Sequence, residues 1–394
     1  MPRFRSLPLL LLCLLLVALS GFSAYRVAQR LGIADLQATG LHRLDLYATS
    51  LEREIGKYAY LPGTLSLTPE VLDLLAGKGG EQATTRVNAY LEKLNERTGT
   101  LSIYVMDTQG KVLASSNWRR PDSFLGEDLS FRPYFRDALE SGSGRFFGIG
   151  TTRGEPGYYL ASALTDDNGT RGVAAIKVSL EQLEKSWTTV EAPVLVADEN
   201  GVVILSAVPA WKFATLRPLD DSTRAAFDHT QQYNRRALQP LGIKTLEDYD
   251  HGARLVRITA SAPETVSVYP VAGRFLEQSR TLPGTPWTLT VLSHLEQVDD
   301  LAQSRAALAA IGAACLCLLV IILNERRRHL RDRLAAREAL QKAHDELERK
   351  VEERTADLSA ANLQLQDEVG ERIRAERTLR AAQDELVQAG KLAV

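Results

Sequence analysis

Two long apolar runs stand out in the pattern of hydrophobic and polar positions, from Leu7 to Tyr25 and from Ala306 to Leu323. Each run is long enough to cross the hydrocarbon core of a bilayer, which is roughly 30 Å thick and needs about 20 helical residues. The pattern therefore predicts transmembrane helices within residues 1–25 and 305–324. A cleaved signal peptide is the competing interpretation of the first run, because its basic start, apolar core and small residues near Ala24 loosely fit such a signal.

Basic residues flank both apolar runs on the sides away from the central segment. Arg3 and Arg5 precede the first run. The arginines that follow the second run are Arg326, Arg327, Arg328, Arg331 and Arg333. Because basic residues favour the cytoplasmic side of a membrane, both ends of the chain are expected to be cytoplasmic, with residues 26–304 outside.

Residues 26–99 follow a helical pattern. The apolar positions that recur at helical spacing are Leu44, Ala48, Leu51, Ile55 and Tyr58. No proline interrupts this stretch before Pro62, so a long helix is expected to leave the membrane. Two shorter helices are predicted at Pro69–Ala76 and at about Thr84–Thr98.

A strand-turn-strand pattern then occurs twice. In the first copy the turn runs from Asp107 to Gly110, and in the second copy Asp198 and Gly201 take the same places. A repeated hairpin alone could arise by chance, but further strand candidates follow each copy. They are Arg145–Gly150, Gly157–Leu164 and Gly172–Leu180 in the first copy, and Leu255–Thr259, Thr265–Pro270 and Trp287–Ser293 in the second. We therefore expect two α+β domains on antiparallel sheets, residues 100–190 and 191–304.

Residues 325–394 are charged and helical, without proline. The apolar residues that fit an a/d seam are Leu340, Leu347, Val351, Leu358, Leu365, Leu379 and Leu386. The register slips between Val369 and Ile373, as a stutter would cause. This pattern predicts a parallel dimeric coiled coil, and a solvated single helix is the alternative.

Composition excludes several classes of function. The formal net charge of -2 gives no overall attraction to nucleic acid. All three cysteines lie in the apolar runs, and neither a phosphate-binding loop nor a metal-spaced His/Cys set is present. His344 stands beside Asp345, but we interpret it as a solvated or seam histidine. No catalytic residue, metal site or cofactor is therefore assigned to this chain.

Two cations stand among apolar or aromatic neighbours in the first domain. Arg132 lies in the stretch SFRPYF, and Lys177 lies in VAAIKVSL, where alternation places it on one face of a strand with Val173 and Ala175. A buried unpaired charge costs several kcal/mol at least, so each cation needs an anionic partner. The planar fork of arginine matches a carboxylate. The two cations could therefore hold the two ends of a short dianion.

Neutral hydrogen-bond donors near the two cations support a ligand site, and other partners for the cations give alternative explanations. The candidate donors are Thr151, Thr152, Tyr134 and one of the adjacent tyrosines Tyr158 and Tyr159, of which one must face away. Lys177 could instead extend to solvent at a sheet edge. Arg132 could pair internally with Glu127, Asp128 or Asp137, and the threonines could be ordinary strand residues.

The membrane-emergent helix, the tandem hairpin domains and the return through the membrane resemble the extracytoplasmic double PAS-like (double Cache) sensor module. The stretches SFRPYF, GIGTT, PGYYLA and LPGTPWTLTVL resemble four-carbon dicarboxylate sensor histidine kinases of the DctB type. The resemblance implies an α+β fold, a membrane-anchored tandem PAS-like sensor with a long N-terminal helix, two transmembrane helices and a C-terminal coiled coil.

The resemblance also implies a ligand. Many amino-acid-binding Cache domains carry an acid near the position of Lys177, which holds the ligand ammonium. A lysine there repels an ammonium and attracts a second carboxylate, so succinate, fumarate or malate is expected in residues 100–190. The domain of residues 191–304 would act as a transmitter.

The resemblance implies a bacterial inner-membrane location, a periplasmic sensor, a homodimer and a two-component pathway. In such kinases, a segment like Gln388-Ala-Gly-Lys-Leu-Ala-Val precedes the phosphoacceptor helix. ATP and magnesium are expected only for that kinase core, which this sequence does not contain. A cognate response regulator and a dicarboxylate transporter are the implied partners. A chemoreceptor, a diguanylate cyclase and a scaffold without ligand are the alternatives.

Overall fold

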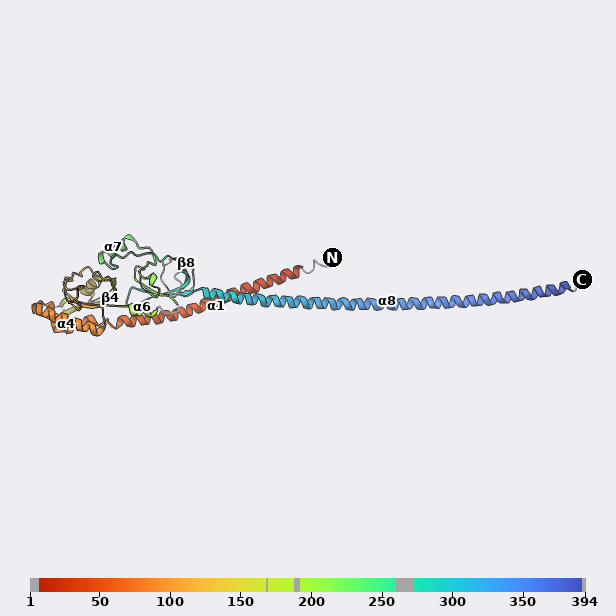
Figure 1. Cartoon of the computed structure of the whole chain (residues 1–394), viewed down its shortest axis with the longest axis horizontal. Helices are drawn as coiled ribbons and strands as arrows, with labels where there is room; N and C mark the ends of the chain where they lie inside the picture. Colours follow the sequence, from red (N-terminus) through yellow and green to blue (C-terminus); the bar gives the residue numbers. More distant parts are fainter. Residues whose placement is uncertain (1–6, 168, 188–191, 260–271, 392–394) are drawn as a thin grey trace. The chain divides into compact units, whose positions relative to one another are not determined.

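The computed structural model describes residues 7–167, 169–187, 192–259 and 272–391. The chain divides into two compact units, and each is described by itself. One unit is Gly21–Leu308, which carries every strand found in the described residues; the other joins Met1–Ser20 to Ala309–Val394. Figure 1 shows the order of elements along the chain.

Helix α1 (Leu7–Gly56) confirms the long helix that the sequence predicts. Its apolar positions Leu44, Ala48, Leu51 and Ile55 are all buried, as is Tyr58 just beyond its end. Helices α2 (Leu61–Thr64), α3 (Pro69–Leu75) and α4 (Gly80–Thr98) follow, with a short 3-10 turn η1 (Leu65–Leu67) between α2 and α3. The two shorter predicted helices are therefore present, and α4 begins four residues before its expected start.

The first sheet has the strand order β2-β1-β5-β4-β3, with every neighbouring pair antiparallel. Its strands are β1 (Ser102–Met106), β2 (Val112–Ser115), β3 (Ser143–Ile149), β4 (Pro156–Asp166) and β5 (Gly169–Val178). Helix α4 packs on one face, where Val87 and Leu91 join Ile103 and Val105 in one core. Helix α5 (Pro133–Ser141) covers the other face beside Tyr104.

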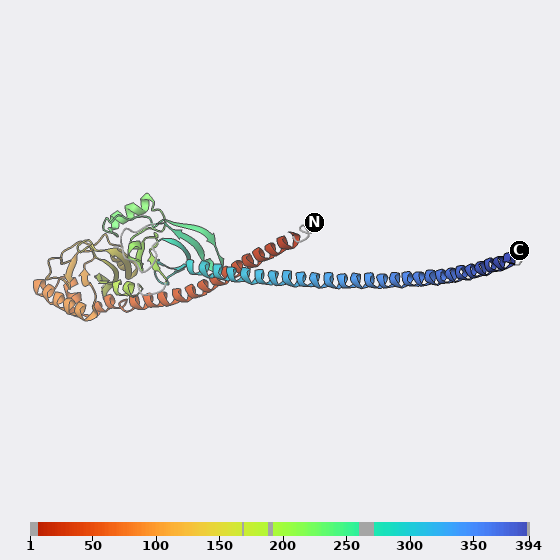
Figure 2. The same ribbon diagram turned by 45° about the vertical axis from the view of Figure 1, so that its right-hand side comes forward.

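The second sheet repeats this plan in the order β7-β6-β11-β10-β9-β8. Its strands are β6 (Val194–Ala197), β7 (Val203–Ser206), β8 (Ile243–Asp248), β9 (Arg254–Ile258), β10 (Gly273–Thr281) and β11 (Thr288–His294). Helix α6 (Glu181–Trp187) links the sheets, and α7 (Asp221–Thr230) precedes β8. The 3-10 turn η2 (Pro209–Trp211) follows β7, and the 3-10 turn η3 (Asp250–Gly252) comes between β8 and β9 in the chain. Figure 2 shows α7, in green, on the side of this unit away from α1.

The repeated hairpin has the same turn in both sheets. The Asp107 amide donates to the Lys111 carbonyl at 3.0 Å, and the Asp198 amide donates to the Val202 carbonyl at 2.9 Å. Gly110 and Gly201 have φ values of 91° and 84°, which residues with a side chain rarely adopt. The α+β class and the internal repeat are therefore confirmed.

The strand predictions for the second sheet were incomplete. The predicted strand Thr265–Pro270 lies outside the described residues. Strands β8 and β10 were missed, because β10 carries Arg274, Glu277 and Arg280 within its length and so lacks a clean apolar alternation. The charged residues pair with groups on other elements: Arg274 with Asp299 and Glu277 with Arg254.

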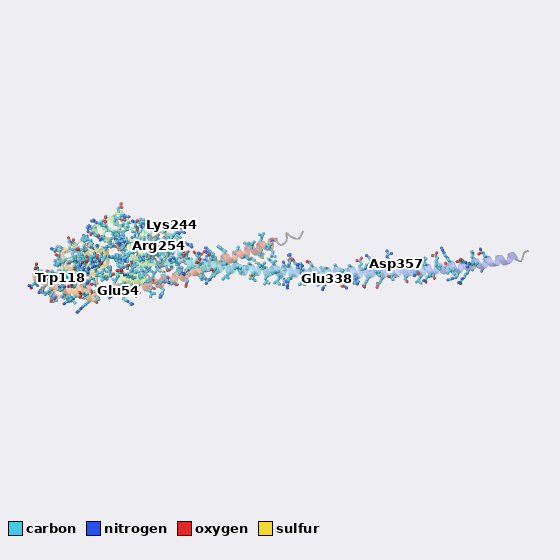
Figure 3. The ribbon with its side chains drawn as sticks, viewed as in Figure 1. Glu54, Trp118, Lys244, Arg254, Glu338 and Asp357 are labelled. Carbon is cyan, nitrogen blue, oxygen red and sulfur yellow. The ribbon has the colours of Figure 1, made fainter. Side chains whose placement is uncertain are left out.

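Helix α8 (Glu296–Lys391) is unbroken and includes both the second apolar run and the expected coiled-coil segment. Both α1 and α8 contain an apolar window long enough to cross a membrane, and neither window is buried within the structure. Along the C-terminal part of α8, apolar seam residues such as Leu347 and Leu358 are exposed. Charged side chains such as Glu338 and Asp357 project from the same helix (Figure 3).

Candidate functional site

Arg132 stands where the loop from β2 meets helix α5. Pro133 occupies the first turn of α5, a position where its missing N–H costs nothing. The Arg132 side chain is turned inward and is only 2% exposed. Nη1 donates to the carbonyls of Thr230 and Gln231, both at 3.2 Å, and Nη2 donates to the Ile149 carbonyl at 3.1 Å.

Lys177 lies in β5, the central strand of the first sheet, and is also only 2% exposed. It therefore does not extend to solvent at a sheet edge. Its Nζ donates to the Glu155 carbonyl at 2.7 Å. In the register of the sheet, Lys177 stands opposite Tyr159 of β4, on the face that carries Val173 and Ala175.

The two cations reach the same loop, residues 149–155 between β3 and β4. Arg132 binds the carbonyl at its start, and Lys177 binds the carbonyl at its end. Tyr159 adjoins both cations, with its ring centroid 6.0 Å from Arg132 Cζ and 5.6 Å from Lys177 Nζ. The structure thus brings together two residues that are far apart in sequence.

No carboxylate forms an ion pair with either cation within the described residues. All the hydrogen bonds of Arg132 and Lys177 go to backbone carbonyls, and neither forms an ion pair there. Glu127 accepts from Thr152, and Asp128 accepts from the Ser130 amide. Among the described residues no ion pair joins Arg132 to Glu127, Asp128 or Asp137, so the alternative of internal pairing does not occur there. Two buried cations therefore lie within 6.0 Å of the centroid of the same aromatic ring.

Burial lowers the pKa of Lys177 to about 8. Glu155 raises this pKa, and Arg153 and Arg132 each lower it by less than Glu155 raises it. Desolvation disfavours the charged form of a lysine, and nearby cations add to this effect. An anion placed beside Nζ would reverse the shift. Binding of a negatively charged group beside Lys177 would therefore raise its pKa toward the ordinary value.

Three tyrosines line the same face. Tyr134 and Tyr159 stack with centroids 5.0 Å apart, and the Tyr104 and Tyr134 hydroxyls lie 2.7 Å apart. Burial raises the pKa of Tyr134 to about 12 and raises the pKa values of Tyr104 and Tyr159 further. These phenols therefore stay neutral at physiological pH. Tyr104 was not among the residues expected from sequence.

The adjacent Tyr158 is placed differently. It points to the opposite face of β4, where its ring lies 4.9 Å from that of Trp287, centroid to centroid. Tyr159 is therefore the tyrosine of this pair that adjoins the cations, and Tyr158 belongs to the core between the two sheets. Strand alternation requires that the two adjacent tyrosines point to opposite faces, but it does not show which of them faces the cations.

Thr151 and Thr152 lie in the loop of residues 149–155, not in a strand as ordinary sheet residues would. Thr152 is exposed, and its hydroxyl donates to Glu127 at 2.9 Å. Thr151 is half-buried. Arg153 pairs with Asp122 at 2.7 Å and with Glu155 at 3.3 Å. The bonds from Thr152 to Glu127 and from Arg153 to Asp122, which we call the latch, hold the loop against the segment that precedes α5.

Two glycines leave room for the lysine side chain. A Cβ on Gly150 would lie 3.1 Å from Lys177 Nζ and 3.4 Å from the Tyr159 hydroxyl, and a Cβ on Gly157 would collide with Lys177 Cε. A separate cavity of about 570 Å³ lies between the two sheets, lined by residues that include Glu155, Ser179 and Phe213. Neither cation lines that cavity.

Sequence and structure comparisons define the class of protein. The Cache domain family matches residues 34–300, so the chain belongs to this family. This confirms the resemblance to double Cache sensors and supports a sensor role.

The relatives are more specific. The chain is 36% identical over 392 residues to the C4-dicarboxylate transport sensor protein DctB of Pseudomonas aeruginosa, covering 99% of this chain and 58% of that protein. It is 31% identical over 309 residues to the protein of the same name from Rhizobium meliloti, covering 78% of this chain and 48% of that one. The chain thus spans about half the length of the curated relatives it matches.

A solved structure shares the fold. The sensor domain of the Vibrio cholerae histidine kinase DctB superposes with a TM-score of 0.58 at 28% identity, covering 66% of this chain and 98% of that one. The resemblance to sensors of the DctB type is therefore confirmed for the fold and the sensor class.

Proposed function

We propose that this chain is the sensory part of a transmembrane two-component sensor and that it binds a four-carbon dicarboxylate. The observation that carries the proposal is the pair of buried cations, Arg132 and Lys177, that lack a carboxylate partner among the described residues. A dianion satisfies both charges, because each of its carboxylates accepts charge-assisted hydrogen bonds from one cation.

Each candidate donor has a proposed role. The Arg132 guanidinium takes one carboxylate and Lys177 takes the other. Tyr159, which adjoins both cations, donates its neutral hydroxyl, and Thr151 and Thr152 close the loop over the ligand. Tyr134 holds Tyr159 in place by ring stacking at 5.0 Å. Tyr158 has no contact with the ligand in this arrangement.

The ligand class follows from charge. A second cation, and not an acid, adjoins the same Tyr159 ring as Arg132, so a ligand ammonium would meet repulsion at Lys177. The names of the relatives, C4-dicarboxylate transport sensor proteins, support the same class. Succinate, fumarate and malate are the proposed ligands.

The membrane arrangement is part of the proposal. The apolar segments of α1 and α8 cross a bacterial inner membrane, with the sheet-bearing unit in the periplasm and both termini in the cytoplasm. The exposed apolar seam of α8 pairs with that of a second copy as a coiled coil. A kinase core beyond this chain, with its ATP and magnesium, would pass the signal to a response regulator that controls dicarboxylate transport.

Calorimetric titration of the full chain in lipid nanodiscs tests the proposal. We expect heat of binding with succinate, fumarate or malate, and none with an amino acid such as alanine. Lys177→Met and Arg132→Lys are both expected to weaken binding, whereas Lys244→Met, at an exposed site on β8 (Figure 3), is the matched control. Absence of heat with all three dicarboxylates would refute the proposal.

A further inference from the structure

The site around Arg132 is completed by a segment from the second half of the sheet-bearing unit. We call residues 230–236, which begin at the last residue of α7, the strap. Its carbonyls at Thr230 and Gln231 accept both hydrogen bonds of Arg132 Nη1. These residues are separated from Arg132 by about a hundred positions in the sequence, and they precede a strand of the second sheet.

The strap also binds the backbone of β3. The Ile149 amide donates to the Gln232 carbonyl at 2.7 Å, and Gln232 Nε2 donates to the Phe147 carbonyl at 3.3 Å. Asn234 Nδ2 reaches the Gly150 carbonyl at 3.4 Å. The strap thus contacts the guanidinium and the start of the 149–155 loop together.

A buried hydrogen bond anchors the strap to the second sheet. The Tyr233 hydroxyl donates to the Asp198 carboxylate at 2.5 Å, and both side chains are buried. The other Asp198 oxygen accepts from the Asn200 and Val202 amides of its own hairpin turn. In the first hairpin, Asp107 accepts only the amides of its own turn, Gln109 and Lys111, among the described residues.

The backbone of the strap is strained. Gln231, Asn234 and Arg235 have φ values of 48°, 45° and 54°, a region that residues with a side chain seldom adopt. Such conformations persist when surrounding contacts hold them, and they cluster at functional sites. Here the contacts are those to Arg132, to β3 and to Asp198.

We propose that the strap positions Arg132 for the dicarboxylate, so that the ligand site is a composite of both sheet-bearing halves. The strap carbonyls hold Nη1 and the Ile149 carbonyl holds Nη2, while Nε has no acceptor among the described residues. A carboxylate can therefore approach Arg132 on the Nε side, and the orientation of the guanidinium is already fixed when it does. Tyr233 and Asp198 are positioning residues in this scheme, because they act through the strap.

The same contacts give a route from ligand to membrane. If the strap favours the orientation of Arg132 that binds ligand, then ligand binding must stabilise the strap by the same factor, since coupling is reciprocal. The Asp198 anchor lies in the β6–β7 hairpin, and β6 pairs directly with β11, which leads into α8. This inference rests on the proposed ligand class, and its test separates the two.

Hydrogen–deuterium exchange and calorimetry on the full chain in nanodiscs test the inference. Without ligand, Tyr233→Phe is expected to raise the exchange of residues 147–150, where the Ile149 amide is bonded to the strap. It should also weaken succinate binding about tenfold, within the range typical of coupled sites. Asn234→Gly, which keeps the positive φ but removes the bond to Gly150, should act in the same direction. Tyr249→Phe removes a tyrosine bond to Glu247 and is the matched control.

The effect of succinate on hydrogen exchange of the strap shows whether the strap positions Arg132 or only stabilises the fold. Succinate should protect residues 230–236 in the wild-type chain, and Arg132→Lys should abolish that protection. Unchanged succinate affinity in Tyr233→Phe, or an unprotected strap in a chain that binds succinate, would overturn the inference. If no dicarboxylate binds, the proposed function fails. Equal exchange of residues 147–150 in Tyr233→Phe and in the wild type would separately refute the claim that the strap holds this segment.

Discussion

The depressed pKa of Lys177 makes dicarboxylate affinity depend on pH in a window where the ligand itself does not titrate. Burial lowers this pKa to about 8 from an ordinary value near 10.5. The carboxylates of the ligand are ionised well below that range. Titration of Lys177 in the free protein therefore controls the affinity above neutral pH.

The size of the effect follows from the fraction of Lys177 that carries its proton. With a pKa of about 8, this fraction falls from about nine-tenths at pH 7 to about one-tenth at pH 9. A bound carboxylate favours the ammonium form, so the complex keeps its proton over this range. Succinate affinity should then fall about tenfold between pH 7 and pH 9.

The same shift predicts the sign of a stability effect. The folded-state pKa of Lys177 lies below its unfolded value, so the unfolded chain binds more protons between pH 8 and 10.5 and stability rises with pH there. At pH 7 the buried charge costs free energy, at most about 3 kcal/mol for this shift. Lys177→Met should therefore raise the melting temperature at pH 7 while it weakens succinate binding.

Calorimetry at pH 7, 8 and 9, with thermal unfolding at the same values, measures both effects. Lys177→Arg keeps its charge throughout this range and should bind with nearly constant affinity. Lys244→Met is the control for loss of an exposed lysine. A wild-type affinity that is constant from pH 7 to 9, or an equal decline in Lys177→Arg, would refute the assigned role of Lys177.

Three further predictions concern the loop, its latch and the C-terminal helix. Gly150→Ala should weaken succinate binding severalfold in calorimetry with little loss of stability, because its Cβ would crowd Lys177 Nζ at 3.1 Å; unaltered binding would contradict this. Arg153→Ala removes the latch to Asp122 and should speed succinate release about threefold in stopped-flow measurements, consistent with a partly exposed ion pair. In a chain whose native cysteines are serine, Leu347→Cys should form disulfide-linked dimers in membranes and Glu346→Cys should not; equal cross-linking would argue against the seam.

Much of the fold was predictable because its signals are local. The spacing of Leu44, Ala48, Leu51 and Ile55 marked the buried face of α1, and those residues are buried. The repeated Asp and Gly of the hairpin turns are required by the turn geometry itself. Strand β10 escaped prediction because its charged residues find partners, such as Asp299 for Arg274, that only the tertiary fold brings near. Strand β8 is exposed along most of its length, so it has no buried apolar face for the sequence to show.

The candidate site was predictable in part. Arg132 and Lys177 stood out because a cation among apolar neighbours is costly wherever the chain folds, and that argument needs no coordinates. The roles of Tyr104 and the strap could not be foreseen, since they depend on which strands pair and on a contact between distant segments. The choice between Tyr158 and Tyr159 depended on which face of β4 meets α5.

The central claim is that Arg132 and Lys177 hold one carboxylate each, and a comparison of two ligands tests it most directly. Succinate and its monoamide, succinamate, have nearly the same shape but differ by one negative charge. Calorimetry on the full chain should show a strong preference for succinate in the wild type, and Lys177→Gln should largely remove that preference while Arg132 still binds the remaining carboxylate. Equal affinity for the two ligands in the wild type, or a preference that survives in Lys177→Gln, would contradict the account.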